Sequence, residues 1–271
     1  MPLRIVSWNV NSIRARLGPM AAFIDRYQPD ILCLQETKAA DPVFPAEDFV
    51  NWGYPHQALS GAVGAPGVAI LSRRPLSRVT ARDWCGRSDH RHLEAQLSNG
   101  LELHNYYVPA GGDIPDPEQN PKYAHKLQFL GEMAAWYDTG ETPSQGVPLK
   151  TALLVGDLNV APLQTDVWSH KQLRNTITHT EVEIAALDRV RQAFGGVDVM
   201  RRLAAEGQSL FTWWSYRARD WQAANRGRRL DHVWATPAAD ARCIAMTIAQ
   251  EVRGWEKPSD HAPVVVDMDL P

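Results

Sequence analysis

Short apolar runs rich in β-branched and aromatic residues recur along the whole chain, and turn residues bound each of them. Such runs are typical of buried β-strands. We therefore predict strands at Leu3–Ser7, Ile31–Gln35, Val68–Ser72, Leu101–Val108, Ala152–Val155, Leu230–Ala235 and Val264–Met268.

Other segments repeat their apolar positions with the 3.6-residue period of a helix. This period covers residues 12–27 and 119–137, where the repeating positions include Phe23 and Leu130. A third segment, residues 180–194, opens with Thr180 and Glu183 at the spacing of a capping box. Helices are therefore expected in all three segments.

Helices and strands alternate, yet the runs at 91–97 and 101–108 are separated by only a few residues. That separation indicates a hairpin, and hence mixed rather than purely parallel sheets. The segments Gly61–Gly67 and Gly111–Pro121 have the glycine and proline content of loops within a domain. We therefore predict a single α/β domain over residues 1–271.

Composition limits the kind of protein this can be. Hydrophobic residues make up 44% of the chain and charged residues 22%, which permits a large core and excludes a disordered chain. The net charge is −3 and the pI about 6.3, so any affinity for nucleic acid must come from local basic patches and a bound cation.

The cysteines and the N-terminus bear on the cellular compartment. The three cysteines are widely spaced and form no CxxC motif, which argues against a structural zinc site or a disulfide framework. The chain shows no signal-peptide pattern at its start and no apolar stretch long enough to span a bilayer. We expect a cytoplasmic protein that does not act at a membrane.

The most informative feature is that several predicted strands end in a carboxylate, an amide or a histidine. The polar ends are Asn9 and Asn11, Gln35 and Glu36, Asp157 and Asn159, Asp231, and Asp260 and His261. Strand ends can place side chains accurately around one cleft. Carboxylates gathered there would repel each other without a cation, and their oxygens suit Mg²⁺ or Mn²⁺.

Each of these motifs is ambiguous alone, since an Asn-x-Asn is usually a turn and a strand-end Glu is often a salt-bridge partner. Taken in order, they are much more specific. The matching segments are residues 8–11 (WNVN), 34–38 (LQETK), 107–109 (YVP), 156–159 (GDLN), 211–214 (FTWW), 229–232 (RLDH) and 257–263 (KPSDHAP). This set resembles the exonuclease III / abasic-site (AP) endonuclease family of the DNase I-like superfamily.

The resemblance implies a four-layer α/β sandwich, in which two packed mixed sheets are flanked by helices. It also implies a Mg²⁺ cofactor, with Mn²⁺ as a possible substitute. The expected ligand set has Glu36 as the main ligand, assisted by Asn11 and Asp260.

The resemblance assigns the catalytic roles as well. Asp157 activates or orients the attacking water, and Asn9 and Asn159 contact the phosphate or hold Asp157. Asp231 orients His261, which stabilises charge on the phosphoryl oxygens. Tyr107 also reaches the phosphate.

The DNA contacts follow from the same resemblance. Trp213 and Leu230 are expected to line an apolar pocket that admits a base-less sugar and excludes an intact nucleotide. Trp214 is expected in the core. The cationic residues expected to contact phosphates are Arg217, Arg228, Arg229 and Lys38, with Arg219, Arg226, Lys122, Lys126 and Lys257 as further candidates.

The chain departs from the family pattern at two places. Ala110 stands where relatives usually carry Asn or Gln, and the segment Gly61–Gly67 is small and apolar where relatives often carry basic or aromatic residues. Both departures predict a weaker grip on duplex DNA and an altered balance between incision and exonuclease action.

The predicted function is Mg²⁺-dependent incision of DNA 5′ to abasic sites, leaving a 3′ hydroxyl, with 3′–5′ exonuclease and 3′-end-cleaning activity. The expected partner is double-stranded DNA with abasic sites or blocked 3′ ends, and the protein is expected to be a monomer. The alternatives are a predominant 3′–5′ exodeoxyribonuclease, another DNase I-like phosphohydrolase, or a DNA-binding scaffold. The segments at 211–214 and 257–261 favour DNA repair, and the intact acidic and histidine set disfavours a scaffold.

Overall fold

The computed structural model describes residues 2–139 and 151–270. These residues form two six-stranded sheets and a short two-stranded ribbon. The first sheet has the order β13-β14-β1-β2-β4-β3 and the second the order β5-β6-β7-β8-β12-β9. Both sheets are mixed, because β1 pairs in parallel with β2, and β7 with β8, while the other neighbours within the sheets are antiparallel.

The strand bounds agree closely with the apolar runs. The first sheet contains β1 (Leu3–Asn9), β2 (Ile31–Gln35), β3 (His56–Ser60), β4 (Val68–Ser72), β13 (Cys243–Ile248) and β14 (Val264–Met268). The second contains β5 (Leu76–Ala81), β6 (His92–Leu97), β7 (Glu102–Tyr107), β8 (Ala152–Asp157), β9 (Val197–Asp198) and β12 (Asp231–Ala235). The ribbon consists of β10 (Trp213–Trp214) and β11 (Gly227–Arg228). The sequence prediction missed the edge strands β3, β5, β9 and β13 and both strands of the ribbon, which are short or carry several polar or exposed residues.

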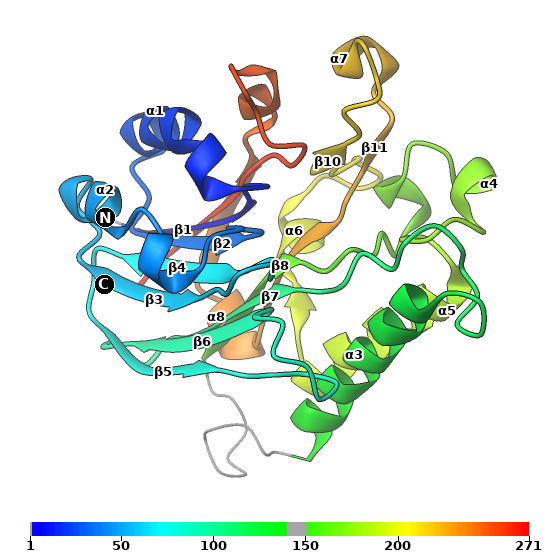
Figure 1. The fold of residues 1–271 in the computed structure, drawn as a ribbon, viewed down its shortest axis with the longest axis horizontal. Coiled ribbons are helices and arrows are strands. Elements are labelled where there is room, and N and C mark those ends of the chain that lie inside the picture. Colours follow the sequence, from blue (N-terminus) through cyan, green and yellow to red (C-terminus); the bar gives the residue numbers. More distant parts are fainter. Residues whose placement is uncertain (1, 140–150, 271) are drawn as a thin grey trace.

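The structure has helices on the outer faces of the two sheets (Figure 1), together with two short ones whose residues Val199, Met200 and Ala239 join the core between the sheets. They are α1 (Leu17–Tyr27), α2 (Ala46–Asn51), α3 (Pro121–Asp138), α4 (His170–Leu173), α5 (Glu181–Phe194), α6 (Val199–Leu203), α7 (Trp221–Ala224) and α8 (Pro237–Asp240). Short 3₁₀ turns occur at η1 (Ile13–Ala15), η2 (Asp41–Val43), η3 (Gln164–Asp166) and η4 (Gln250–Gly254). The helix predicted from residue 12 begins only at Leu17, after η1, whereas α5 has the predicted capping box between Thr180 and Glu183.

Alternating side chains of the strands fill separate apolar layers. On β1, Leu3 and Ile5 face the core between the sheets, while Val6 and Trp8 face the core beneath α1 and α2. A third core lies beneath α3 and α5 and includes Phe129. Burial on both faces explains why the strands are continuously apolar. The predicted four-layer α/β sandwich is confirmed. No helix among the described residues is long and apolar enough to cross a membrane.

Candidate active site

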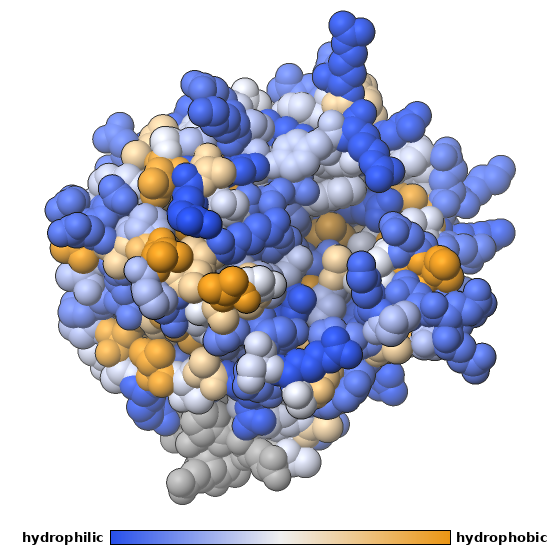
Figure 2. Space-filling view, in the orientation of Figure 1, coloured by the Kyte–Doolittle hydropathy of each residue, from blue (hydrophilic) through white to orange (hydrophobic). Residues whose placement is uncertain are grey.

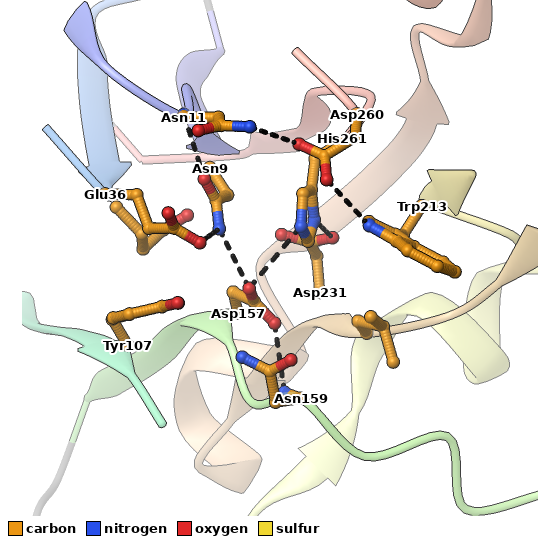
Figure 3. Close-up of polar contacts among 12 residues, drawn as sticks. Asn9, Asn11, Glu36, Tyr107, Asp157, Asn159, Trp213, Asp231, Asp260 and His261 are labelled. Carbon is orange, nitrogen blue, oxygen red and sulfur yellow. Dashed lines mark hydrogen bonds and ion pairs between the residues drawn. The ribbon is translucent and has the colours of Figure 1, made fainter. Parts of the chain in front are cut away.

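The strand pairing brings the polar strand ends to one edge of the sandwich. Asn9 is opposite Gln35 in the parallel pair β1–β2, which puts Glu36 just beyond the same edge. Asp157 is the register partner of both Tyr107 on β7 and Asp231 on β12. Figure 3 shows these side chains pointing toward one another from the two sheets.

Gly156 makes the position of Asp157 possible. Its φ is 139°, and a Cβ atom there would lie 2.0 Å from the carbonyl oxygen of Tyr106 on the neighbouring strand. A side chain would therefore push β8 away from β7. Glycine before the acidic residue is a packing requirement of this sheet edge.

Asp157 is buried and held from several sides. Its Oδ2 accepts a hydrogen bond from Asn9 Nδ2 at 2.9 Å, and its Oδ1 accepts one from the backbone N–H of Asn159 at 3.0 Å. The Asn159 side chain donates to the carbonyl of Val108 at 2.9 Å. Burial raises the pKa of Asp157 above its ordinary value, and the nearby His261 only partly opposes that rise. A carboxyl fixed in this way can orient a water and accept its proton.

His261 lies between two carboxylates. Its Nδ1 donates to Asp231 Oδ2 at 2.7 Å, while its Nε2 lies 3.6 Å from Asp157 Oδ2. Burial lowers the pKa of an imidazole, but these two carboxylates outweigh burial and raise the pKa of His261. The ring is therefore cationic at neutral pH, with Nε2–H facing the reacting side of the site.

A second group of oxygen donors lies beside Asn9. Asn9 Nδ2 also donates to Glu36 Oε1 at 2.9 Å, and Asn11 Nδ2 donates to Asp260 Oδ1 at 3.0 Å. The Lys38 ammonium contacts Glu36 Oε2 at 2.7 Å and Asn11 Oδ1 at 2.6 Å. Burial raises the pKa of Glu36, but the hydrogen bonds from Asn9 and Lys38 outweigh it and keep the carboxyl ionised.

This second group fits a divalent cation. Its donors are carboxylate and amide oxygens, which Mg²⁺ and Mn²⁺ prefer, and a positive charge already lies against two of them. Asp157, Asp231 and His261 are also close enough together to hold a metal ion. We favour the donors around Glu36, because His261 Nδ1 already donates to Asp231 and an imidazole protonated on both nitrogens has no lone pair for a metal.

The backbone is strained around these donors. Asn11, Glu36, Lys38 and Asn159 all have positive φ, between 45° and 53°. Non-glycine residues rarely adopt this conformation, and they retain it where the surroundings impose it, often at functional sites. The sequence carries no direct signal for this strain.

Tyr107 forms the wall opposite His261. It is buried beside the carboxylates of Glu36 and Asp157, and the Arg91 guanidinium lies 4.8 Å from its ring centre. Burial raises the pKa of Tyr107 well above its ordinary value, and the Glu36 and Asp157 carboxylates add to the rise. The phenol therefore stays protonated and serves as a hydrogen-bond donor.

The site opens into a cleft of about 630 Å³. Glu36, Tyr107, Asp157, Asn159, Asp260 and His261 line one part of it, and Trp168, Trp213, Arg217, Arg226, Arg228 and Leu230 line another. Figure 2 shows one face of the molecule, on which hydrophilic residues dominate and apolar residues form small separate patches. The sequence prediction missed Trp168, which lies in an irregular segment without a motif.

A neighbouring cavity of about 720 Å³ shares Tyr107, Ala110 and Gly112 with this cleft. Residues of the small apolar loop Gly61–Gly67 line one side of it, and Arg87, Arg91, Lys122 and His125 line the other. Positive charge is therefore present beside the loop, although the loop itself supplies none. The sequence prediction did not identify Arg87 or Arg91.

Two residues predicted to contact DNA are inside the protein. Arg229 is fully buried, where Nε and Nη2 bind Asp166 at 2.9 and 3.0 Å and Nη1 binds Asp198 at 2.7 Å. Lys126 is fully buried against Glu183 and donates to the Asn159 carbonyl at 2.7 Å. Neither side chain can reach a phosphate, so the structure corrects both predictions.

The remaining predicted residues lie at the surface or where the sequence placed them. Arg217, Arg219, Arg226, Lys38 and Lys257 are exposed, whereas Arg228 is half-buried. Trp214 is 1% exposed and packs with Phe211 and Ala262, which agrees with its expected place in the core. Lys257 lines a separate cavity beside α1.

Comparison with known proteins gives a consistent picture. The model of the endonuclease/exonuclease/phosphatase family matches residues 6–261. Exodeoxyribonuclease III of Haemophilus influenzae is 30% identical over 274 residues, which cover 97% of this chain and 98% of the relative.

Solved structures are equally similar over the full length. An AP endonuclease from Archaeoglobus fulgidus has a TM-score of 0.88 at 34% identity, covering 99% of this chain and 100% of its own. The 3′ phosphatase NExo from Neisseria, bound to a product DNA hairpin, has a TM-score of 0.88 at 28% identity with the same coverage. The chain therefore belongs to the endonuclease/exonuclease/phosphatase family and, within it, to the nucleases of the exodeoxyribonuclease III and AP endonuclease type.

Proposed function

We propose that this nuclease hydrolyses the phosphodiester on the 5′ side of an abasic site in duplex DNA, in a Mg²⁺-dependent reaction that leaves a 3′ hydroxyl. The observation that carries the proposal is the pairing of Asp157 and His261 at the base of a cleft that also holds Trp213 and Leu230. The first pair suits phosphoryl chemistry, and the second offers an apolar place for a sugar without its base. The 3′–5′ exonuclease and 3′-end-cleaning activities would use the same groups more weakly.

In the proposed mechanism Asp157 orients a water toward phosphorus and takes its proton. The bond from phosphorus to the 3′ oxygen breaks, and that oxygen leaves as the 3′ hydroxyl after gaining a proton. His261, held by Asp231, places a positive N–H against the phosphoryl oxygens as charge develops on them. Asn9 keeps Asp157 in place through its 2.9 Å hydrogen bond.

Glu36, Asn11 and Asp260 are the residues that we propose to hold the metal. When bound there, Mg²⁺ would neutralise phosphate charge and support the leaving oxygen. Lys38 would then have to give up its contacts with Glu36 and Asn11, which its exposed side chain permits.

We propose that separate cationic side chains, rather than one continuous basic face, bind the DNA phosphates. Arg217 lines the cleft, and Arg87 and Lys122 line the neighbouring cavity. Because each such contact releases counterions from DNA, affinity is expected to fall steeply with salt. The cleft is complete within one chain, which supports the proposal that the protein acts as a monomer.

One gel experiment tests the proposal. Duplexes with an internal abasic site, a nick with a 3′ block, or no lesion are incubated with the protein in Mg²⁺ or in EDTA, with Asp157→Asn as the inactive control. We expect incision of the abasic duplex in Mg²⁺ and none in EDTA. Removal of the 3′ block at the nick, and degradation of the 3′ ends of the intact duplex, should both be slower. Efficient degradation of intact 3′ ends with abasic sites left uncut would replace the proposal with a 3′–5′ exodeoxyribonuclease.

A further inference from the structure

Two tryptophans at the mouth of the cleft are each covered by an arginine. The Arg228 guanidinium lies 5.3 Å from the ring centre of Trp213, and that of Arg226 lies 4.9 Å from the ring centre of Trp168. The two pairs come from one small structure, since Trp213 pairs with Arg228 across the β10–β11 ribbon and Trp168 is hydrogen-bonded to Gly227 of the same ribbon. The two arginines differ in their surroundings.

Arg228 is held firmly inside the cleft. Its Nη1 donates to Thr178 Oγ1 at 2.7 Å and to the Ile177 carbonyl at 3.2 Å, while Trp213 covers its plane. Its Nε is enclosed by protein, whereas its Nη2 makes no hydrogen bond to a described residue and remains accessible in the cleft. Arg226, in contrast, is exposed. A ligand atom that accepts a hydrogen bond from Nη2 would gain affinity, because this donor is charged and the guanidinium is already fixed by its bonds to Thr178 and Ile177.

The abasic sugar offers such an acceptor. Loss of the base leaves an oxygen on C1′, as a hydroxyl in the closed ring or an aldehyde in the open chain. An intact nucleotide carries its base at this carbon, and a tetrahydrofuran analogue carries only hydrogen. Leu230 and Trp213 can pack against the carbon skeleton, but neither has a polar atom suited to recognising that oxygen, because Trp213 Nε1 already donates to Asp260 at 3.0 Å.

We infer that Arg228 determines substrate specificity by donating a hydrogen bond to the C1′ oxygen of the abasic sugar. This inference rests on the proposed function and deepens it. The cleft would then select its substrate in two ways: its apolar walls exclude a base by shape, and Arg228 recognises the oxygen that replaces the base. Two other roles for Arg228 predict a different result. If Arg228 bound a phosphate, or only supported Trp213, its replacement would lower kcat/KM equally for every substrate.

The test compares kcat/KM for duplexes that differ only at the lesion, which is either a natural abasic site or tetrahydrofuran. The wild-type protein is expected to favour the natural site. Arg228→Met should reduce kcat/KM on the natural site by about tenfold to a hundredfold, the usual range for a charge-assisted hydrogen bond. Its effect on tetrahydrofuran should be much smaller, so the preference disappears.

Two further variants distinguish a specific contact from general damage. Arg228→Lys keeps the charge but lacks a guanidinium, which can bind Thr178 through one nitrogen and the ligand through another, so it should also lose the preference while remaining folded. Arg226→Met is the matched control, because it removes the arginine that covers Trp168. It should lower kcat/KM for both substrates by the same factor. Equal losses on both substrates in both Arg228 variants would overturn the inference, as would a wild-type protein that treats the two lesions alike.

Binding provides a second readout that does not depend on turnover. Fluorescence anisotropy in EDTA measures the Kd for each lesion duplex with the wild-type protein and with Arg228→Met. Tighter wild-type binding to the natural site, abolished in the variant, supports the inference even if incision fails. If the wild-type protein does not incise DNA but still binds the natural site more tightly, only the proposed function is refuted. If the wild-type protein binds the two lesion duplexes with equal affinity, the inference is refuted.

Discussion

Replacement of Arg229 by methionine tests whether the arginines beside the Trp213–Trp214 segment act on DNA or on the fold. Arg229 is 0% exposed, and its three side-chain hydrogen bonds to Asp166 and Asp198 are 2.7 to 3.0 Å long. Methionine would fill much of the space but leave the buried Asp166 carboxylate with weaker compensation. Removal of one partner from a buried ion pair costs about 3–5 kcal/mol.

Asp166 keeps its ion pair with Arg201 and a hydrogen bond from Leu163 N, so the lower half of that range is expected. A loss of about 3 kcal/mol corresponds to a fall in Tm of roughly 6–12 °C for a protein somewhat smaller than this one. Thermal and urea denaturation measure this change. The salt dependence of DNA binding by the folded variant should match that of the wild type.

Arg217→Met is the matched control, because Arg217 is exposed and lines the cleft. This variant should keep its Tm, while the slope of log K against log salt becomes shallower by about 0.9 for each lost phosphate contact. An Arg229→Met protein with wild-type Tm and a shallower salt slope would refute the structural reasoning and restore the phosphate-contact hypothesis.

Three further changes probe the catalytic groups and their support. Asp157→Asn should reduce turnover by about a hundredfold to ten-thousandfold and leave the Kd for DNA largely unchanged, and near-normal turnover would make Asp157 structural. Asp231 raises the pKa of His261, so Asp231→Asn should lower that pKa and move the alkaline limb of the kcat/KM–pH profile to lower pH. If the alkaline limb does not move, Asp231 does not control the pKa of His261 and the two residues act independently. Lys126→Met should cost about 3 kcal/mol in urea unfolding, because the buried Glu183 carboxylate loses its countercharge and keeps only its hydrogen bonds from Thr178 and Thr180, and unchanged stability would contradict the importance of the ion pair.

Much of the fold could be predicted from local patterns. A strand buried on both faces needs a continuous apolar run, so the central strands β2, β4 and β14 match their predicted bounds. Edge strands do not have this requirement. β5 is mostly exposed and β13 partly exposed, so their sequences lack the pattern that would identify them.

The site was predicted in the same uneven way. Polar residues that interrupt an apolar strand at its end stand out in a sequence, and the pairing of β1, β2, β7, β8 and β12 brings such residues together. Trp168 has no such contrast, because it follows the buried Val167 in an irregular segment that the folded chain places beside β11.

The sequence alone determined the central strands, the longer helices, the family resemblance and the residue types available for chemistry. It could not determine which of several neighbouring cations face solvent. Arg228 and Arg229 are adjacent in the chain, yet one lines the cleft and the other is buried against Asp166, 63 residues away. Whether a charge is exposed or paired depends on partners that only the folded chain brings near, because the cost of burying a charge is decided by the groups that surround it.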